Sequence, residues 1–509
     1  MTNLFKKLAL LLAVTTLTLG TLSTGCTNSV NIDSNKSVPT FDSGKQLRTF
    51  ADVPPTPNER NLILYRDAGL THYNMTEDYI WLSNKDGKYG HQTGEVDDAG
   101  NFVSEWDETN GADDGVVNAD YVAALNLCEQ LGLKAVIRNY YADPTYFKND
   151  SDETRWRDAP IEHVSYRIPI RDVGTTLTDL GSVDGYYMGD EPTWKGIDRM
   201  ADMPTWYNTQ YEHGGVNWFH INLLQSYGNY LFDGHTYEEY VDKYCEVVLS
   251  KVKGNKTLGT DYYPLKEDKY GNPYVMDGIL FDYFVIAEKV KEMNATLSDK
   301  DKVLTNFCMQ TYNANYTREL SSEADMNFQV NLALAFGAKS LQYYRYTSAA
   351  GETCMVARYT NDPLPLYYWV QGANKKAQAL APAILEFDWV GTKVYQGEQL
   401  KDKTNEKAFN LIADRTLEKF TFIDTLTARL DTVVSEMQDK SGNKAYMVVN
   451  YSEPSLGQVD FVNMSFVGNV KKALIYIDGQ SELVDVVNGK IQVKLDAGSA
   501  AFIYPVQGE

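Results

Sequence analysis

The chain has 509 residues, of which 43% are hydrophobic, and its 69 acidic and 47 basic residues give a formal net charge of −22. The length suits one large domain and a smaller one. The acidic balance argues against nucleic acid as a partner, because such binding depends on Lys and Arg contacts to phosphate. It also disfavours an anionic membrane surface, whereas a neutral or cationic partner is compatible with it.

The first 26 residues predict a targeting segment. Lys6 and Lys7 precede an apolar run over residues 8–22, and small residues follow up to Cys26. This order is typical of a secretory signal and not of a spanning helix. It resembles the bacterial lipoprotein signal, which implies lipidation of Cys26 and a secreted protein anchored to the cell envelope. Ordinary cleavage, with no role for Cys26, is the alternative. Residues 27–44 are rich in Ser, Asn and Asp and predict a flexible tether.

Between residues 45 and 388 short strand-like runs alternate with helical patterns. The predicted strands are 47–51, 71–75, 134–139, 183–190, 217–224, 257–264, 303–312 and 340–346. The predicted helices are 59–69, 119–131, 173–180, 237–251, 278–293, 323–336 and 367–380. Strict alternation implies parallel strands. Eight such units predict an α/β fold, a (β/α)8 TIM barrel with insertions.

Residues 389–509 predict a compact antiparallel β domain. Alternating apolar and polar runs cover 445–450, 473–477 and 490–495. Asp-Gly, Asn-Gly and Ala-Gly turns separate them, and such turns are hairpin signals. This pattern favours a β-sandwich.

The fourth predicted strand ends in Gly189-Asp190-Glu191-Pro192. Pro192 has no N–H to donate and would stop the strand there. Two carboxylates at a strand tip are unsuited to a hydrophobic core, because burying an unpaired charge costs free energy. In a parallel barrel that tip faces the active site. Asp261 is a further carboxylate near the end of a predicted strand, the sixth, where Tyr262 and Tyr263 follow it.

The run from Gly189 to Pro192 resembles the strand-four Asn-Glu-Pro of the large clan of retaining barrel glycosidases, with Asp in place of Asn. The resemblance implies that Glu191 is the general acid. Adjacent Asp and Glu also resemble the β-N-acetylhexosaminidases, in which the Asp orients the substrate's acetamide nucleophile and the Glu is the acid. The retaining clan carries a nucleophilic Glu at the end of strand seven, where this chain has Gln310, and an amide cannot act as that nucleophile.

Three versions of the chemistry therefore stay open. Glu191 acts as acid with Asp261 as base or nucleophile, Asp190 and Glu191 act with substrate assistance, or there is no catalysis. Glycosidases use two carboxyl groups, ~5–5.5 Å apart for retention and ~6.5–9.5 Å apart for inversion. We expect a glycoside hydrolase acting on extracellular oligo- or polysaccharide. The alternatives are a catalytically inactive surface carbohydrate-binding lipoprotein and a purely structural envelope lipoprotein.

Amides, phenols and aromatic faces near the other strand tips suit sugar hydroxyls and C–H surfaces. The predicted substrate-binding residues are Arg138, Asn139, Trp194, Asn222, Gln225, Tyr263, Gln310, Tyr312, Tyr344 and Tyr346.

No cofactor and no metal are expected, because the six histidines form no ligand spacing. Cys128, Cys245, Cys308 and Cys354 are far apart and are expected to be buried free thiols, with one disulfide as the alternative. The acid-rich stretch 105–114 does not match an EF-hand loop and is predicted to be a solvated loop, with a bound ion as the alternative.

Overall fold

The computed structural model describes residues 37–75, 82–83, 89–96, 102–107, 119–138, 180–313, 317–347, 353–357, 360–398 and 405–507. The predicted signal peptide with Cys26, the first part of the tether, the helix over 173–179 and Asn139 lie outside the described residues. Most of the acid-rich stretch does so as well.

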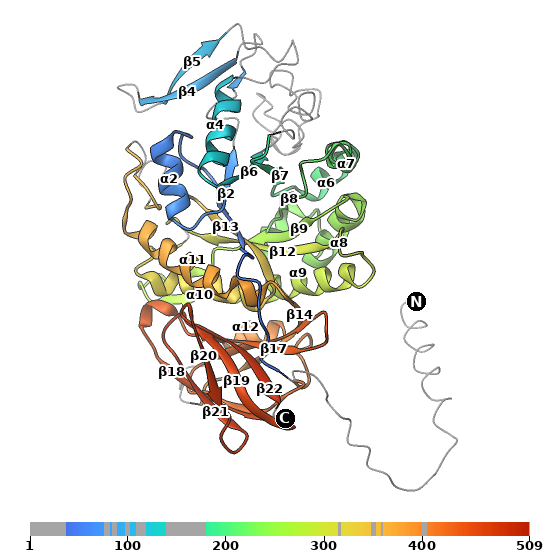
Figure 1. The fold of residues 1–509 in the computed structure, drawn as a ribbon, viewed down its shortest axis with the longest axis vertical. Helices are drawn as coiled ribbons and strands as arrows, with labels where there is room; N and C mark the ends of the chain where they lie inside the picture. The colour runs from blue at the N-terminus through green and yellow to red at the C-terminus, as the bar shows by residue number, and fades with distance from the viewer. Residues whose placement is uncertain are drawn as a thin grey trace, which may run out of the picture. The chain divides into compact units, whose positions relative to one another are not determined.

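Eight parallel strands form the largest sheet (Figure 1). They are β1 (Arg48–Ala51), β2 (His72–Met75), β6 (Lys134–Arg138), β7 (Val183–Asp190), β8 (Phe219–Asn222), β9 (Lys256–Asp261), β12 (Val303–Gln310) and β13 (Ala338–Tyr344). Their order in the sheet is β1-β13-β12-β9-β8-β7-β6-β2, and the neighbours pair in parallel. The predicted eight-stranded α/β barrel is confirmed.

The two ends of this sheet, β1 and β2, meet through two threonines. The Thr71 N–H donates to the Thr49 carbonyl at 2.9 Å, and the Thr49 N–H donates to the Thr71 hydroxyl at 2.9 Å. The sheet thus closes through side chains as well as backbone.

Helices follow most of the strands. They are α2 (Glu59–Asp67), α4 (Ala119–Gln130), α6 (Trp194–Arg199), α7 (Met203–His213), α8 (Tyr237–Val247), α9 (Ile279–Asn294), α10 (Glu323–Ala335) and α11 (Pro365–Ile384), with the 3₁₀ turns η5 (Ser226–Leu231) and η6 (Leu249–Lys251). Thr236 begins α8 with a reciprocal capping box to Glu239, which satisfies N–H groups that the helix leaves unpaired. Gly337 follows α10 at φ +82°, a conformation that glycine adopts freely.

Two insertions and one helical connection were not predicted. Strands β3 (Leu82–Ser83), β4 (Tyr89–Val96) and β5 (Phe102–Asp107) form a small sheet between β2 and α4. The prediction of a loop is therefore wrong for residues 105–107. A hairpin of β10 (Leu265–Glu267) and β11 (Pro273–Val275) separates β9 from α9, and α6 and α7 separate β7 from β8.

The C-terminal part consists of two antiparallel sheets, as predicted. The larger contains β14 (Phe387–Tyr395), β16 (Thr432–Asp439), β17 (Lys444–Asn450), β19 (Val470–Ile477), β20 (Gln480–Asp485) and β22 (Ala500–Gln507). The smaller contains β15 (Ile423–Thr427), β18 (Asp460–Phe466) and β21 (Lys490–Leu495). The helix α12 (Glu406–Leu411) and the turn η7 (Pro454–Leu456) complete it.

The barrel and the C-terminal sheets share one hydrophobic core. The ring of Trp389 on β14 stacks on Phe336 of the barrel with centroids 6.3 Å apart. Buried Arg318 of the barrel binds Asp325 on α10 and Glu453 in the C-terminal part. Continuous apolar packing and a buried ion pair across the boundary tie the two parts together.

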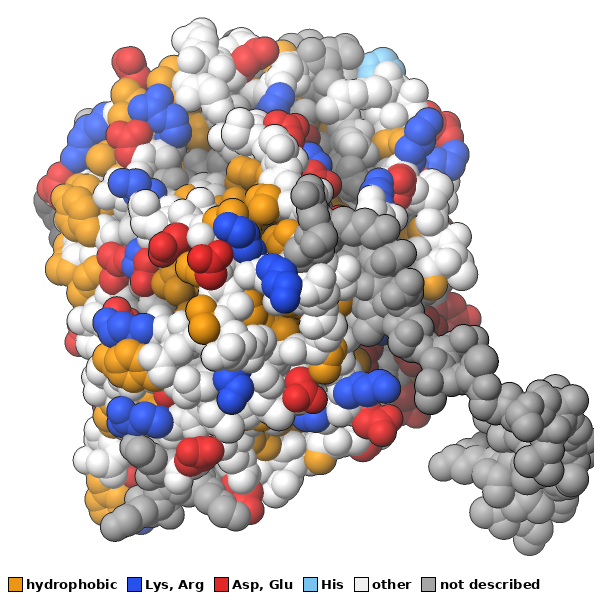
Figure 2. All heavy atoms as spheres, turned by 60° about the horizontal axis from the view of Figure 1, so that its bottom comes forward, with side chains coloured by type: hydrophobic (Ala, Val, Ile, Leu, Met, Phe, Trp, Pro, Cys, Tyr) orange, Lys and Arg blue, Asp and Glu red, His pale blue; other side chains and the backbone are white. Residues whose placement is uncertain are grey.

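Cys128, Cys245, Cys308 and Cys354 are buried free thiols, which confirms that prediction. Among the described helices, we find none with the length and apolar character that a membrane crossing requires. On the face drawn in Figure 2, acidic and basic side chains of the described residues are intermixed.

Candidate active site

Polar side chains gather at the C-terminal ends of the barrel strands. Parallel strands bring these ends together on one side of a barrel. Four carboxyl groups lie there, and we call them the carboxyl cluster: Asp52 after β1, Asp190 and Glu191 at the end of β7, and Asp261 at the end of β9.

Glu191 and Asp261 share a hydrogen bond between their side chains. Asp261 is only 2% exposed, whereas Glu191 is partly exposed. Burial raises the pKa of Asp261 well above its usual range, and the charge and the hydrogen bond of Glu191 add to the shift. Both effects favour the protonated form of Asp261, as expected for a buried carboxyl group beside a second one.

The backbone of Glu191 is held in the left-handed region at φ +47°. Its N–H donates to the carbonyl of Asn222 at 2.8 Å, which fixes it to the neighbouring strand. This conformation costs about 1–2 kcal/mol for a residue with a Cβ atom. Strain of this kind is concentrated at functional sites.

Asp190 is held by three donors. Nη2 of Arg138 lies 3.0 Å from Oδ2, the Tyr187 hydroxyl lies 2.8 Å from Oδ1, and Nδ2 of Asn222 lies 3.3 Å from Oδ1. The side chain is 26% exposed, so a ligand can still reach it. The structure thus brings the predicted residues Arg138, Asn222 and Asp190 together.

Asp52 was missed from the sequence, although it follows a strand tip just as Asp261 does. It accepts from Nδ2 of Asn74 at 2.8 Å and from Nε2 of Gln342 at 2.6 Å, and Arg138 lies 3.7 Å away. Burial raises the pKa of Asp52 to about 7, against the opposing effect of Arg138 and with a further rise from Asp190. An acid directly after the first strand was the signal that could have found it.

Gln310, at the end of the seventh barrel strand, is fully buried and serves the surrounding loops. Its Oε1 accepts from the Leu265 N–H at 3.3 Å, and its Nε2 donates to the carbonyls of Tyr312 and Arg318 at 3.3 and 3.1 Å. The amide is therefore occupied within the protein. This placement disfavours a direct contact of Gln310 with sugar.

Three of the predicted tyrosines form a wall beside Asp261. The rings of Tyr263, Tyr312 and Tyr344 lie 5.1–5.9 Å apart between centroids. Tyr263 also hydrogen-bonds to Asp261. Tyr346 is buried apart from them, against Tyr65.

Trp194 on α6 has two close side-chain partners. The His235 ring stacks on it at 3.7 Å between centroids, and Nζ of Lys243 lies 4.3 Å from its centroid. Trp194 is partly exposed, and these two partners reduce the ring surface on which a sugar could stack.

Three buried oxygens near β8 and β9 have no hydrogen-bond partner among the described residues. They are Oδ1 of Asp261, Oδ1 of Asn222 and Oε1 of Gln225. Buried polar atoms are almost always paired. These acceptors are suited to hydroxyl or N–H donors of a ligand.

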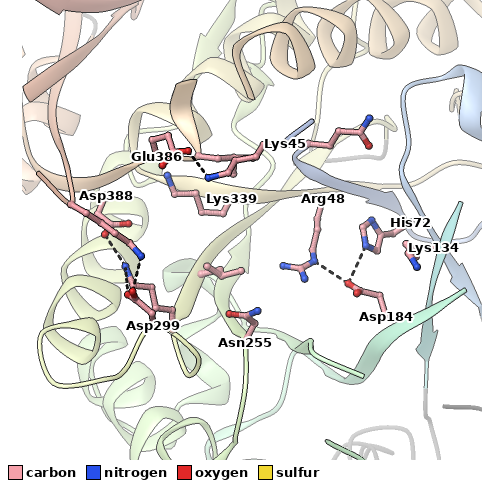
Figure 3. A pocket seen from close by; sticks show the side chains of 15 residues that line it. Lys45, Arg48, His72, Lys134, Asp184, Asn255, Asp299, Lys339, Glu386 and Asp388 are labelled. Atoms are coloured by element: carbon pink, nitrogen blue, oxygen red, sulfur yellow. Dashed lines mark hydrogen bonds and ion pairs between the residues drawn. The ribbon is translucent and has the colours of Figure 1, made fainter. Parts of the chain in front are cut away.

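A cavity of about 690 Å³ lies at the opposite end of the barrel, among the first residues of the strands. Figure 3 shows Lys45 and Lys339 beside Glu386 on one side, and Asp184 with Arg48 and His72 on the other. Asp184 lies 3.1 Å from Arg48 and 3.2 Å from His72. Paired charges at this end of a barrel serve stability rather than chemistry, so we place the site at the carboxyl cluster. Among the described residues, no group of acids, histidines and cysteines forms a metal site.

No family model and no curated protein sequence matches the chain. Solved structures with a similar fold include one described as a glycoside hydrolase, with 12% identity, a TM-score of 0.47 and coverage of 93% of this chain and 95% of that chain. Another is a GH27 β-L-arabinopyranosidase from Geobacillus stearothermophilus, with 11% identity, a TM-score of 0.44 and coverage of 91% and 97%. A third is a GH30 endoxylanase from Clostridium papyrosolvens C71, with 10% identity, a TM-score of 0.43 and coverage of 92% and 99%. Similarity at this level carries no argument about the reaction, which must come from the site itself.

Proposed function

We propose that this chain is a glycoside hydrolase acting on extracellular oligo- or polysaccharide, with Glu191 as general acid. The observation that carries the proposal is the hydrogen-bonded pair of Glu191 and Asp261 beside Asp190, at the end of the barrel where such folds perform chemistry. Glycoside hydrolysis needs one protonated and one ionised carboxyl group around the scissile bond. A pair that shares one proton supplies both forms.

Glu191 and Asp261 differ in solvent exposure, which assigns them different roles. Glu191 is partly exposed and Asp261 is buried, so a substrate meets Glu191 first. The shared proton passes to Glu191 and then to the glycosidic oxygen as the bond from that oxygen to the anomeric carbon breaks. Water adds its hydroxyl to the anomeric carbon, and its remaining proton returns to the pair. The overall reaction is hydrolysis with the enzyme regenerated.

Asp190 has a fixed position that suits a third role. Arg138, Tyr187 and Asn222 orient its two oxygens, as the donors of a charge-assisted network do. A carboxylate held in this way stabilises positive charge that develops on the sugar ring, or accepts from an N–H group of the substrate. We infer that a bound substrate breaks the hydrogen bond between Glu191 and Asp261, because glycosidase carboxyl groups flank the scissile bond.

The test is Glu191→Gln, measured on a panel of oligosaccharides that the unmodified protein hydrolyses. Loss of general acid catalysis should lower kcat by about 10²–10⁴-fold. Asp198→Asn is the matched control, because Asp198 is an exposed carboxylate on α6 that pairs with Lys243. A loss of less than about tenfold in Glu191→Gln would remove Glu191 from the mechanism.

Carbohydrate binding without turnover is the second candidate, and Gln310 favours it. The seventh strand offers an occupied amide where the retaining clan carries its nucleophile. The same oligosaccharide panel separates the two candidates when binding and hydrolysis are measured in parallel. Binding with no product after prolonged incubation selects the binding protein.

Secretion and lipid anchoring at Cys26 are a separate proposal that rests on the N-terminal pattern alone. Metabolic labelling with a fatty-acid analogue should mark the expressed protein, and Cys26→Ser should abolish the label. An unlabelled parent protein in the culture medium would point to ordinary signal cleavage.

A further inference from the structure

The outer face of the small C-terminal sheet carries an ordered set of uncharged polar side chains, with the exposed Lys490 and Lys494 along its β21 edge. Along β18 the residues alternate strictly, with Val462 and Met464 buried and Phe461 and Asn463 exposed. The strand register places Thr427 and Gln492 on either side of Asn463, and Thr425 beside Ser465. We call this set the sheet face, consisting of Thr425, Thr427, Phe461, Asn463, Ser465 and Gln492.

The sheet face is hollowed rather than flat. A groove of about 360 Å³ runs over the three strands, and most of its lining is hydroxyl or amide. Lys490 is the one charged residue among the described residues that line it. In a chain with a net charge of −22, a groove lined by neutral hydrogen-bonding groups without a carboxylate favours an uncharged polar ligand.

The polar side chains of the sheet face hold one another in place. The hydroxyls of Thr425 and Ser465 lie 2.5 Å apart, and Nε2 of Gln492 donates to Oδ1 of Asn463 at 2.9 Å. Each of these groups can make further hydrogen bonds, because a hydroxyl or an amide has more capacity than one contact uses. Side chains that are already fixed lose little conformational entropy when a ligand binds.

Phe461 supplies the apolar part of the surface. It is 40% exposed and stands on the same side of β18 as Asn463, two residues along the strand. An aromatic ring packs against the C–H faces of sugars, while neighbouring amides and hydroxyls bind the sugar hydroxyls. The cross-strand neighbour of Phe461 is Lys494, whose charge is paired with Asp496. The uncharged donors and acceptors further along the face, together with the exposed ring, match the chemistry of a neutral polysaccharide.

We propose that the sheet face binds a neutral polysaccharide chain at a site separate from the carboxyl cluster. The inference goes beyond the proposed hydrolysis and does not depend on it, since the sheet face contains no catalytic group of that proposal. Binding here would hold the protein on a polymer while the barrel acts on, or binds, sugars elsewhere.

Affinity electrophoresis of the full chain tests this, in gels that contain soluble xylan, β-glucan or galactomannan. The Glu191→Gln background keeps the polymer intact. We expect retardation by at least one polymer, and at least a tenfold weaker apparent Kd after the double substitution Phe461→Ala and Asn463→Ala. The matched control is Leu483→Ala on β20, which is 41% exposed on the other sheet and should leave retardation unchanged.

Each outcome of the electrophoresis either supports or overturns binding at the sheet face. No retardation by any neutral polymer, equal retardation of the double variant, or retardation by polygalacturonate alone overturns the inference. Circular dichroism and thermal unfolding of the double variant check that it is folded. Retardation of the parent that is lost in the double variant supports the sheet-face site, even when no hydrolysis is found. Hydrolysis of short substrates without binding at the sheet face leaves the proposed function unaffected.

Discussion

At the scale of single residues, three carboxyl groups within one site have three different surroundings. Asp261 is buried and hydrogen-bonded to Glu191, Asp190 accepts from three donors, and Asp52 is enclosed by amides beside Arg138. Burial raises the pKa of both Asp261 and Asp52 above the usual range of an aspartate. These differences allow neighbouring acids to take separate parts in one reaction.

Glu191 is both strained and crowded by a second acid, so we expect Glu191→Gly to stabilise the protein while it abolishes activity. Glycine adopts φ +47° freely, and relief of the strain is worth about 1–2 kcal/mol. Thermal unfolding should show a higher Tm than that of the parent. Asp233→Gly, at φ +54° on an exposed turn, should raise Tm by a smaller amount and leave activity intact. A lower Tm for Glu191→Gly would show that its contacts outweigh the strain.

Asp52 should make the protein less stable as the pH rises. Its pKa is about 7 in the folded protein and about 3.9 in an unfolded chain, so the folded state binds more protons between these values. Stability is then fully present below about pH 4 and is lost as the pH rises to about 7. We expect Asp52→Asn to flatten the decline in Tm between pH 5 and pH 7.5. Asp282→Asn should act in the same direction, because burial also raises the pKa of Asp282 to about 7. An unchanged slope in both variants would contradict this.

At the scale of elements, Gln310 and Arg318 together hold the loops around the site in place. The Gln310 amide holds the start of the β10–β11 hairpin and the loop after β12, and Arg318 in that loop binds Asp325 and Glu453. Asp325 in turn caps α10 in a reciprocal capping box with Ser322. Gln310, at the end of β12, therefore stabilises the loops around the site.

We expect Arg318→Met to lower the free energy of unfolding by about 3–5 kcal/mol, because it leaves two buried carboxylates without their cation. Chemical denaturation of the variant and the parent measures the difference. Lys494→Met is the control, since Lys494 and Asp496 form an exposed pair that should contribute less than about 1 kcal/mol. If both substitutions lowered the free energy of unfolding equally, the buried ion pairs of Arg318 would not stabilise the protein as expected.

The strands of the barrel could be predicted because buried strands and amphipathic helices leave local patterns in the sequence. The insertion β3–β5 could not, since β3 has two residues and β4 is rich in polar residues and glycine. The predicted strand over 257–264 ends instead at Asp261, because the chain turns there towards the β10–β11 hairpin. The contact between Glu191 and Asp261 joins residues 70 positions apart in the printed sequence, and only the closed barrel determines it.

The local chemistry of the site was harder to predict than its position. Gln310 and Trp194 have the residue types of sugar-binding groups, and their neighbours in space decide how much of that capacity is free. Asp52 was overlooked because a single acid after a short strand is a weak pattern. The roles of all these residues in binding stay predictions.

At the scale of the whole molecule, barrel and C-terminal sheets should unfold together. Trp389 stacks on Phe336, Arg415 pairs with Glu238 and Glu288 of the barrel, and the apolar core is continuous. We expect a single calorimetric transition for the full chain. A truncated protein ending at residue 385 should be insoluble or should lack a cooperative transition, because it exposes the shared core. Two separate transitions, or a soluble and cooperative barrel, would refute this.

The start of the described chain runs along the end of the barrel opposite the carboxyl cluster. Phe41 packs against Phe387 at 6.2 Å between ring centroids, and Lys45 pairs with Glu386 at the rim of the cavity there. The consequence is one of orientation. The first described residues pack at the end where the barrel strands begin, so they leave the end that carries the carboxyl cluster to the loops that follow the strands.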